Sequence, residues 1–315
     1  MKTQAKVSKN VTLVEVGLRD GLQNESIVLS QKVRLELAQK LVAAGARRLE
    51  LGAFVRSDKV PQMQGSFELI QKFYEDLPAE MRRKLRTSAL VPNLHGWQEA
   101  QQTQLSEIAV FASASETFSH KNINCSIDES FVRFAPVIKA ARARGLKVRG
   151  YLSCCFGCPY EGKVSQQKVI QLAKRLRKIG CEEISIGDTI GVATPGQVQK
   201  MFTALLSAFS AFELAGHFHD TRGTAMANIW ASYELDLRTF DTSLGGLGGC
   251  PYAPGSAGNV ATEDVVYLFE QSGIKTGLNL PMLLQTHDWL SKTMKKELDS
   301  KMGKAGILRP LASRL

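Results

Sequence analysis

The chain has 315 residues, of which 44% are hydrophobic and 22% are charged, so it is long enough to enclose one large core. It contains no run of about 18 apolar residues, which argues against a membrane span. Forty Lys and Arg residues against thirty Asp and Glu residues give a net charge of +10, which suits a polyanionic partner such as nucleic acid or a phosphorylated cofactor.

Nucleic acid is the less favoured of these two partners. The sequence shows no zinc finger, no aromatic RNA-binding motif and no long basic tail, and its Lys and Arg residues are scattered along helix-like segments. Six cysteines in a chain of this length, with no apolar stretch in residues 1–10, indicate reduced thiols in a cytoplasmic protein. The final Ser313-Arg314-Leu315 resembles the Ser-Lys-Leu peroxisomal address, which has meaning only for a eukaryotic source.

Short β-branched or apolar runs alternate along the chain with longer amphipathic segments, as is typical of parallel β/α architecture. We predict eight strands, at 11–16, 47–51, 87–91, 107–112, 147–153, 183–186, 214–219 and 239–243. Eight such units predict a (β/α)₈ barrel, which needs about 250 residues. An open doubly wound sheet is the competing fold, and the absence of a Gly-x-Gly-x-x-Gly turn after the first strand weakens it.

Helix signals support this arrangement and account for the remaining length. A helix over 31–44 has Ser30 as its expected N-cap and Gly45 as its C-cap, and a helix over 165–179 is closed by Gly180. We expect one domain over residues 1–315, with 275–315 as a helical C-terminal extension whose main helix covers 281–298.

Polar side chains concentrate where the predicted strands end, which is where barrel enzymes place their catalytic groups. Arg19 and Asp20 follow the first strand, Glu50 lies at the end of the second, Asn93 follows the third and Asp188 closes the sixth. These positions predict a site at the carboxyl end of the barrel.

Two histidines in the seventh strand indicate a metal site. His217 and His219 are two residues apart, so the alternation of a strand points both imidazoles to one side. Asp20 can complete the set. A mixed nitrogen and oxygen site open to substrate suits a divalent ion, with Mg²⁺ or Mn²⁺ as the first choice and Zn²⁺ as the second.

The glycine-rich loop, residues 245–252, has four glycines that lead into Cys250 and Pro251. Such a run favours neither helix nor strand, and we expect a loop that closes like a lid before the next helix starts near Thr262. Cys250 is its candidate nucleophile or proton carrier. A tight turn around a buried, inert cysteine is the alternative.

The remaining cysteines and histidines give weaker signals. The group Cys154, Cys155 and Cys158 could suggest zinc or redox chemistry, but no second cysteine pair lies at finger spacing, so a structural turn is favoured. We expect Cys125 and Cys181 to be packing residues. Three histidines in polar segments are expected to face solvent: His95, His120 and His287.

At the N-terminal end, the run Val14–Glu25 resembles the first signature of the 3-hydroxy-3-methylglutaryl-CoA lyases. Further matches cover nearly the whole chain and lie at 121–126, 157–163, 187–191, 217–221 and 245–264. A broader superfamily of metal-dependent lyases and synthases shares the Arg-Asp start and the His-x-His, whereas the glycine-rich loop resembles the lyase branch itself.

The resemblance implies retro-Claisen cleavage of 3-hydroxy-3-methylglutaryl-CoA to acetyl-CoA and acetoacetate, a reaction of leucine degradation and ketone-body formation. It implies an acyl-CoA substrate and a divalent metal cofactor with four ligands: Asp20, His217, His219 and Asn259. Arg19 would contact the thioester oxygen, and Cys250 would transfer a proton. Glu50 and Asp188 would orient Arg19 and the histidines, with Asp188 also near substrate, and Lys121 and Asn122 would contact the CoA arm. A homodimer is the expected assembly.

Three positions near the predicted mouth depart from the lyase pattern. The lyases carry serine at Ala53, Ser-Pro-Lys-Trp at residues 56–59 and tyrosine at Arg222, so a related 3-hydroxyacyl-CoA stays open as substrate. A Claisen-type synthase is a second alternative, although many synthases carry an added C-terminal region for which this chain has no room. A basic nucleic-acid-binding or redox-sensing protein is the alternative without catalysis.

Overall fold

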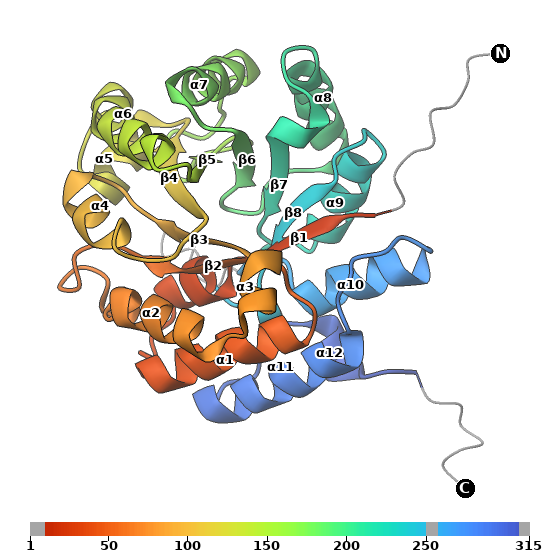
Figure 1. Ribbon diagram of the computed structural model, residues 1–315. Coiled ribbons are helices and arrows are strands. Elements are labelled where there is room, and N and C mark those ends of the chain that lie inside the picture. Colours follow the sequence, from red (N-terminus) through yellow and green to blue (C-terminus); the bar gives the residue numbers. More distant parts are fainter. Residues whose placement is uncertain (1–9, 250–257, 309–315) are drawn as a thin grey trace, which may run out of the picture.

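The computed structural model describes residues 10–249 and 258–308. Eight parallel strands form a closed barrel in sequence order, and β8 pairs with β1 to complete it. Helices surround the barrel between the strands (Figure 1). The predicted (β/α)₈ barrel is confirmed, and the open doubly wound sheet was the wrong alternative. Cys250 and the C-terminal Ser313-Arg314-Leu315 lie outside the described residues.

The strands lie close to their predicted positions. Their bounds are β1 Thr12–Glu15, β2 Arg48–Ala53, β3 Arg86–Leu90, β4 Glu107–Ser113, β5 Lys147–Ser153, β6 Glu183–Asp188, β7 Leu214–Phe218 and β8 Thr239–Thr242. His219 was predicted inside the seventh strand but follows it, in an isolated bridge with Asn259. The carboxyl ends of β1 and β7 therefore present their polar residues at one mouth of the barrel.

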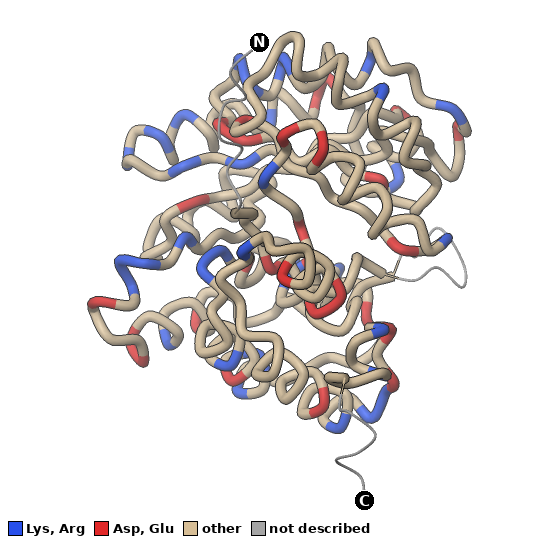
Figure 2. The backbone as a smooth tube through the Cα atoms, turned by 90° about the vertical axis from the view of Figure 1, so that its right-hand side faces the viewer, with Lys and Arg blue, Asp and Glu red and all other residues tan. Residues whose placement is uncertain are grey.

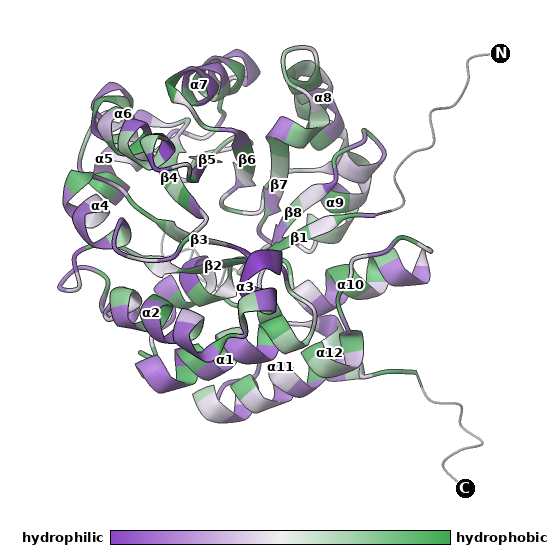
Figure 3. Ribbon diagram, viewed as in Figure 1, coloured by the Kyte–Doolittle hydropathy of each residue, from purple (hydrophilic) through white to green (hydrophobic). Residues whose placement is uncertain are grey.

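The helices are amphipathic and pack their apolar faces on the strands. Their bounds are α1 Gln31–Ala43, α2 Ser66–Asp76, α3 Ala79–Lys84, α4 Leu94–Ala100, α5 Glu116–Ile123, α6 Ile127–Ala143, α7 Gln166–Ile179, α8 Pro195–Leu206, α9 Ala225–Tyr233, α10 Thr262–Gln271, α11 Leu280–Met294 and α12 Lys301–Ala305. Figure 3 shows hydrophobic and hydrophilic residues alternating around helices such as α6 and α8. Ser30 caps α1 as predicted, since its Oγ accepts a hydrogen bond from the Val33 amide at 3.3 Å.

Lys, Arg, Asp and Glu residues are spread along the described chain (Figure 2). Several of them are buried inside the barrel. Arg48 of β2 donates to Glu183 of β6 through two hydrogen bonds of 2.8 and 2.9 Å, which join opposite sides of the barrel. Arg149 of β5 is fully buried and donates to Glu183 at 2.6 Å. Buried ion pairs add little net stability, but they fix the positions of their members. No helix in the described ranges combines the length and apolar character needed to cross a membrane.

The C-terminal extension packs against the outside of the barrel beside α1 and α10 (Figure 1). The helix predicted over 281–298 is shorter than expected, because α11 ends at Met294 and Lys295 adopts a left-handed conformation with φ 50°. The segment that follows α11 runs back to the barrel, where the Asp299 amide donates to the carbonyl of Gly245 at 2.9 Å. Leu298 lies so close that a Cβ on Gly245 would be 2.5 Å from it. The extension therefore supports the start of the glycine-rich loop.

Candidate active site

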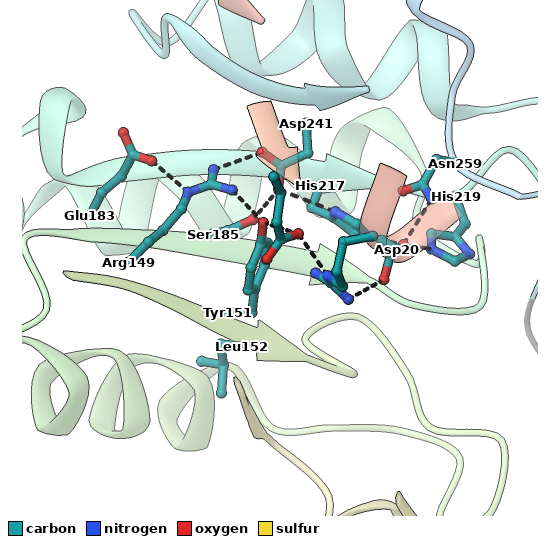
Figure 4. Close-up of polar contacts among 12 residues, drawn as sticks. Asp20, Arg149, Tyr151, Leu152, Glu183, Ser185, His217, His219, Asp241 and Asn259 are labelled. Carbon is teal, nitrogen blue, oxygen red and sulfur yellow. Dashed lines mark hydrogen bonds and ion pairs between the residues drawn. The ribbon is translucent and has the colours of Figure 1, made fainter. Parts of the chain in front are cut away.

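Three of the predicted metal ligands meet at the mouth of the barrel. Asp20 lies in a π-helical turn (η1, Gly17–Gly21) directly after β1, His217 lies in β7, and His219 follows it. The Asp20 Oδ2 atom is 4.0 Å from Nε2 of His217 and 3.9 Å from Nε2 of His219 (Figure 4). One ligand atom from each residue lies within 4.8 Å of the others. The structure thus brings together residues that are nearly 200 positions apart.

Asn259 completes this cluster and supports the fit to a metal ion. Its Nδ2 donates to Asp20 Oδ2 at 2.8 Å and to the Leu247 carbonyl at 3.2 Å. Its Oδ1 is buried and accepts no hydrogen bond from the described part of the chain. A carbonyl oxygen with open lone pairs beside a carboxylate and two imidazoles is a donor set suited to a divalent cation.

The ionisation states of Asp20 and His219 also suit metal binding, whereas the pKa of His217 is raised, because its hydrogen bond to Asp241 and the charge of Asp20 outweigh burial. Burial opposes the charge of Asp20, but the positive field of Arg19 and the two histidines outweighs it and lowers the pKa of this carboxyl to about 2. Burial, reinforced by His217, lowers the pKa of His219 to about 4. Near neutral pH the site therefore contains an ionised carboxylate and a neutral imidazole, which are the forms that bind metals.

Arg19 is held rigidly next to this cluster. Its Nε donates to Glu50 Oε2 and its Nη1 donates to Asp20 Oδ1, both at 2.7 Å. Its guanidinium also lies 5.0 Å from the centre of the Tyr151 ring. Burial disfavours the charge, but Glu50 and Asp20 raise the pKa of Arg19 above its usual range, so the side chain is a fixed cation.

Glu50 occupies the position predicted for it behind Arg19. Its Oε2 accepts from Arg19 Nε and, at 3.0 Å, from the Tyr151 hydroxyl. Burial raises the pKa of this carboxyl, and Arg19 opposes that shift. Tyr151 belongs to no sequence motif and is identified only by its place in β5 and its contacts there.

The role of Asp188 in orienting the histidines stays a prediction: its charge interacts with His217, while its hydrogen bonds go to the backbone. Its two carboxylate oxygens accept the backbone amides of Val192 and Ala193 at 3.0 and 2.9 Å, so it shapes the loop after β6. The partner of His217 is Asp241 of β8, whose Oδ2 lies 3.2 Å from His217 Nδ1. Contact of Asp188 with substrate stays a prediction.

A cavity of about 350 Å³ opens over the cluster. Its lining includes Arg19, Asp20 and both histidines. Its lining also includes a set of polar and basic side chains nearer the surface, namely Gln23, Asn24, Arg56, Lys59, Asn93, His95, Asn122 and Arg133. The cavity can therefore accept a molecule with a reactive end at the cluster and anionic groups outside.

The two residues expected to contact a CoA arm differ in position. Asn122 of α5 lines the cavity. Lys121 is exposed and its Nζ lies 5.2 Å from the centre of the Tyr160 ring. Asn122 is therefore the better placed of the two.

The start of the glycine-rich loop is held by two buried carboxylates that the sequence analysis did not identify. Glu15 Oε1 accepts the Leu244 amide at 3.0 Å, and both oxygens of Glu263 accept the Gly245 amide at 3.0 Å. Burial raises the pKa of Glu15 to about 7 and that of Glu263 to about 8. Gly249, the last described residue before Cys250, lines the cavity.

The other cysteines are structural, as expected. Cys154 and Cys158 pack with Phe118 in a small buried cluster after β5, and the Cys158 thiol lies 3.0 Å from Ser115 Oγ. Cys125 and Cys181 are also buried. Burial raises the pKa of the Cys154 thiol well above its usual range, which makes it a poor nucleophile.

His95 and His120 are exposed as predicted, but the prediction for His287 is wrong. His287 is only 6% exposed, because it lies on the inner face of α11. Gly303 of α12 lies against its ring, where a Cβ would be 2.2 Å from Nε2. The residues next to His287 in the sequence are polar and predicted exposure, so they did not indicate its packing against α12.

Of the positions that depart from the lyase pattern, Arg56 and Lys59 line the cavity. Ala53 is buried at the end of β2. Arg56 pairs with the exposed Asp58 at 2.6 Å, and Lys59 lines the cavity. Arg222 Nη1 donates to the carbonyls of Ile190 and Gly191, each at 2.9 Å, and so ties the loop after β7 to the loop after β6.

Comparisons with known proteins agree with this geometry. The family model described as HMGL-like matches residues 10–290. A hydroxymethylglutaryl-CoA lyase from Pseudomonas mevalonii is 49% identical over 275 residues, covering 87% of this chain and 89% of the relative. The mitochondrial hydroxymethylglutaryl-CoA lyase of Rattus norvegicus is 45% identical over 297 residues, covering 94% and 90%.

Solved structures give the same result. The hydroxymethylglutaryl-CoA lyase from Pseudomonas aeruginosa superposes with a TM-score of 0.90 at 44% identity, covering 99% of this chain and 100% of that one. An HMG-CoA lyase from Acinetobacter baumannii, in complex with coenzyme A and 3-methylmalate, gives a TM-score of 0.90 at 33% identity over 98% and 100% of the two chains. The sequence matches and the barrel together show that this chain belongs to the HMGL-like family.

Proposed function

We propose that this protein cleaves 3-hydroxy-3-methylglutaryl-CoA to acetyl-CoA and acetoacetate. The observation that carries the proposal is the cluster of Asp20, His217 and His219 beside the fixed cation of Arg19, on the wall of one cavity. The relatives named as hydroxymethylglutaryl-CoA lyases, at 45 and 49% identity, support this choice of substrate.

The reaction makes two demands on the protein. The proton of the tertiary hydroxyl leaves, and its electron pair forms the ketone of acetoacetate as the bond between C2 and C3 breaks. The electrons of that bond pass to the thioester as an enolate, which then takes a proton at carbon to give acetyl-CoA. The site must therefore favour an alkoxide at one end and an enolate at the other.

Asp20, His217, His219 and Asn259 would hold a divalent cation at the hydroxyl end. When bound, the ion supplies Lewis-acid polarisation of the substrate oxygens. The mixed nitrogen and oxygen donors favour Mg²⁺ or Mn²⁺.

Arg19 meets the demand at the enolate end. Glu50 and Asp20 hold two of its nitrogens, and Tyr151 lies against its guanidinium, so the remaining N–H groups are oriented before substrate arrives. A preorganised donor aimed at developing charge in a dry site costs no reorganisation during the reaction. We assign Arg19 to the thioester oxygen.

Proton transfer to the enolate carbon is assigned to Cys250. This assignment rests on the sequence, in which Cys250 directly follows Gly249, a residue that lines the cavity. A thiol is acidic enough to protonate an enolate carbon and to be regenerated near neutral pH.

The CoA portion of the substrate is assigned to the outer part of the cavity. Arg56, Lys59 and Arg133 supply positive charge for phosphates, and Asn122 supplies an amide for the pantetheine arm. Lys121 stays a candidate for an outer contact. The solved relative in complex with coenzyme A supports an acyl-CoA ligand. We also propose a homodimer, which sedimentation analysis would test.

The test is incubation of the purified protein with 3-hydroxy-3-methylglutaryl-CoA in Mg²⁺, in Mn²⁺ and in excess chelator. We expect equal amounts of acetyl-CoA and acetoacetate with either metal and none with chelator. Full turnover in chelator would contradict the metal assignment. Release of free CoA without acetoacetate would contradict the reaction itself.

A further inference from the structure

Asp241 lies beneath the metal cluster and accepts three hydrogen bonds there. It belongs to β8 and is 1% exposed. Its Oδ1 accepts from Arg149 Nη2 at 2.7 Å, and its Oδ2 accepts from Ser185 Oγ at 2.7 Å. The same Oδ2 lies 3.2 Å from His217 Nδ1 (Figure 4).

This contact sets the direction of the His217 ring. As a metal ligand His217 must be neutral and so has one N–H, and because the Asp241 carboxylate can only accept, that proton lies on Nδ1 and the lone pair lies on Nε2. Nε2 faces Asp20 Oδ2 at 4.0 Å, inside the cluster. The tautomer that Asp241 selects is therefore the one that can bind a cation there.

His219 lacks a comparable support. Its Nδ1 is buried and forms no hydrogen bond with the described residues. The ring centres of His217 and His219 are 5.2 Å apart, so both histidines belong to one site. Asp241 holds the ring of His217 but not that of His219. A change at Asp241 should therefore act through His217.

Asp241 is fixed from the interior of the barrel and not from the cavity. Arg149, its ion-pair partner, also donates from Nε to Glu183 at 2.6 Å and from Nη1 to the Tyr151 hydroxyl at 3.0 Å. Asp241 is absent from the described residues that line the cavity. It therefore acts on the reaction only through other residues.

We propose that Asp241 is the positioning residue of the metal site, which orients His217 and selects its Nδ1–H tautomer. The inference rests on the proposed function only in requiring that the cluster binds a divalent cation. It does not depend on the identity of the acyl-CoA.

The test is calorimetric titration of Mn²⁺ into the wild type and two variants. Asp241→Asn should weaken Mn²⁺ binding by about 10- to 100-fold, as expected when a carboxylate behind a ligand histidine is lost. Glu183→Gln is the matched control, because it removes a carboxylate from the same Arg149 but on the side away from His217. The control should keep the wild-type affinity, while thermal unfolding of the metal-free proteins reports any shared loss of stability.

Wild-type affinity in Asp241→Asn, or an equal loss in both variants, would overturn the proposal. A second measurement reads the tautomer of His217 in the wild-type protein itself. In ¹⁵N-edited NMR of the Mg²⁺-loaded protein, with His217 assigned through His217→Gln, the proton should reside on Nδ1. A proton on Nε2 would overturn the proposal.

These outcomes are separable from the proposed function. Weak Mn²⁺ binding in Asp241→Asn, together with a wild type that leaves 3-hydroxy-3-methylglutaryl-CoA uncleaved, would refute the proposed reaction and support the role of Asp241. Cleavage by the wild type with unchanged Mn²⁺ binding in Asp241→Asn would support the proposed reaction and refute the role of Asp241.

Discussion

Replacement of Arg19 by methionine tests the assignment of the enolate end of the site. Methionine keeps much of the apolar length of arginine but removes the charge and every donor. It deletes the bonds to Glu50 and Asp20 together with the N–H groups directed at the substrate. Two effects follow, one on the transition state and one on the fold.

The expected sizes of these effects differ in origin. Loss of one preorganised donor lowers kcat by about 10²- to 10³-fold, equivalent to about 2.7–4 kcal/mol, with a modest change in KM. The fold is weakened because Glu50, which is fully buried, keeps the Tyr151 hydroxyl as its one hydrogen-bond donor among the described residues. Breaking such a pair lowers the free energy of unfolding by about 3–5 kcal/mol, and the loss is smaller if Glu50 becomes protonated.

Steady-state kinetics and urea unfolding separate the two effects when Arg19→Met is compared with Arg19→Met/Glu50→Gln. The double variant removes the unpaired carboxylate, so we expect it to regain most of the stability and none of the kcat. A kcat within a few-fold of wild type, with an effect confined to KM, would refute the role of Arg19. Recovery of kcat in the double variant would show that Arg19 acts only through the fold.

Three further predictions concern the metal, the thiol and the buried acids. His219→Ala should weaken Mn²⁺ binding in calorimetry and abolish turnover, because it removes one of the clustered ligands. Cys250→Ser should fold and bind Mn²⁺ but lose orders of magnitude in kcat, because a hydroxyl is a far weaker acid than a thiol; bound substrate should also slow alkylation of wild-type Cys250, as followed by mass spectrometry. Glu263 should contribute stability that is lost between about pH 4.5 and pH 8, because the folded protein keeps Glu263 protonated up to about pH 8 while the unfolded chain ionises it near 4.5. Glu263→Gln should remove a decline on the order of 3–5 kcal/mol in the free energy of unfolding, as measured by urea denaturation across this range.

Each of these has an outcome that would contradict it. Unchanged Mn²⁺ affinity in His219→Ala would remove that residue from the ligand set. Near-normal kcat in Cys250→Ser, or equal alkylation rates with and without substrate, would leave the thiol as an inert turn residue. A pH dependence of unfolding that is the same in Glu263→Gln and wild type would assign the decline to other groups.

The barrel and most of the metal cluster could be predicted because their signals are local. Alternating apolar runs marked the strands, and the two-residue spacing of His217 and His219 placed both imidazoles on one side. Asp20 could be added because barrel strands present their carboxyl ends at one mouth. These inferences needed only periodicity and topology.

The residues that support the cluster could not be predicted, because they depend on contacts between distant strands. Asp241 has no motif, and its role appears only when β8 lies beside β7 with His217 paired to Asp241. Asp188 is an equal choice in sequence, and its hydrogen bonds to backbone amides of its own loop appear only in the structure. The burial of His287 likewise depends on a glycine of another helix, Gly303.

The proposed reaction is tested most directly by cleavage of 3-hydroxy-3-methylglutaryl-CoA in D₂O with Mg²⁺, followed by mass spectrometry of both products. The account predicts acetoacetate and acetyl-CoA in equal amounts, with one deuterium in the methyl group of each acetyl-CoA, because the enolate carbon takes its proton from an exchangeable group. Free CoA without acetoacetate, or acetyl-CoA without deuterium, would contradict it.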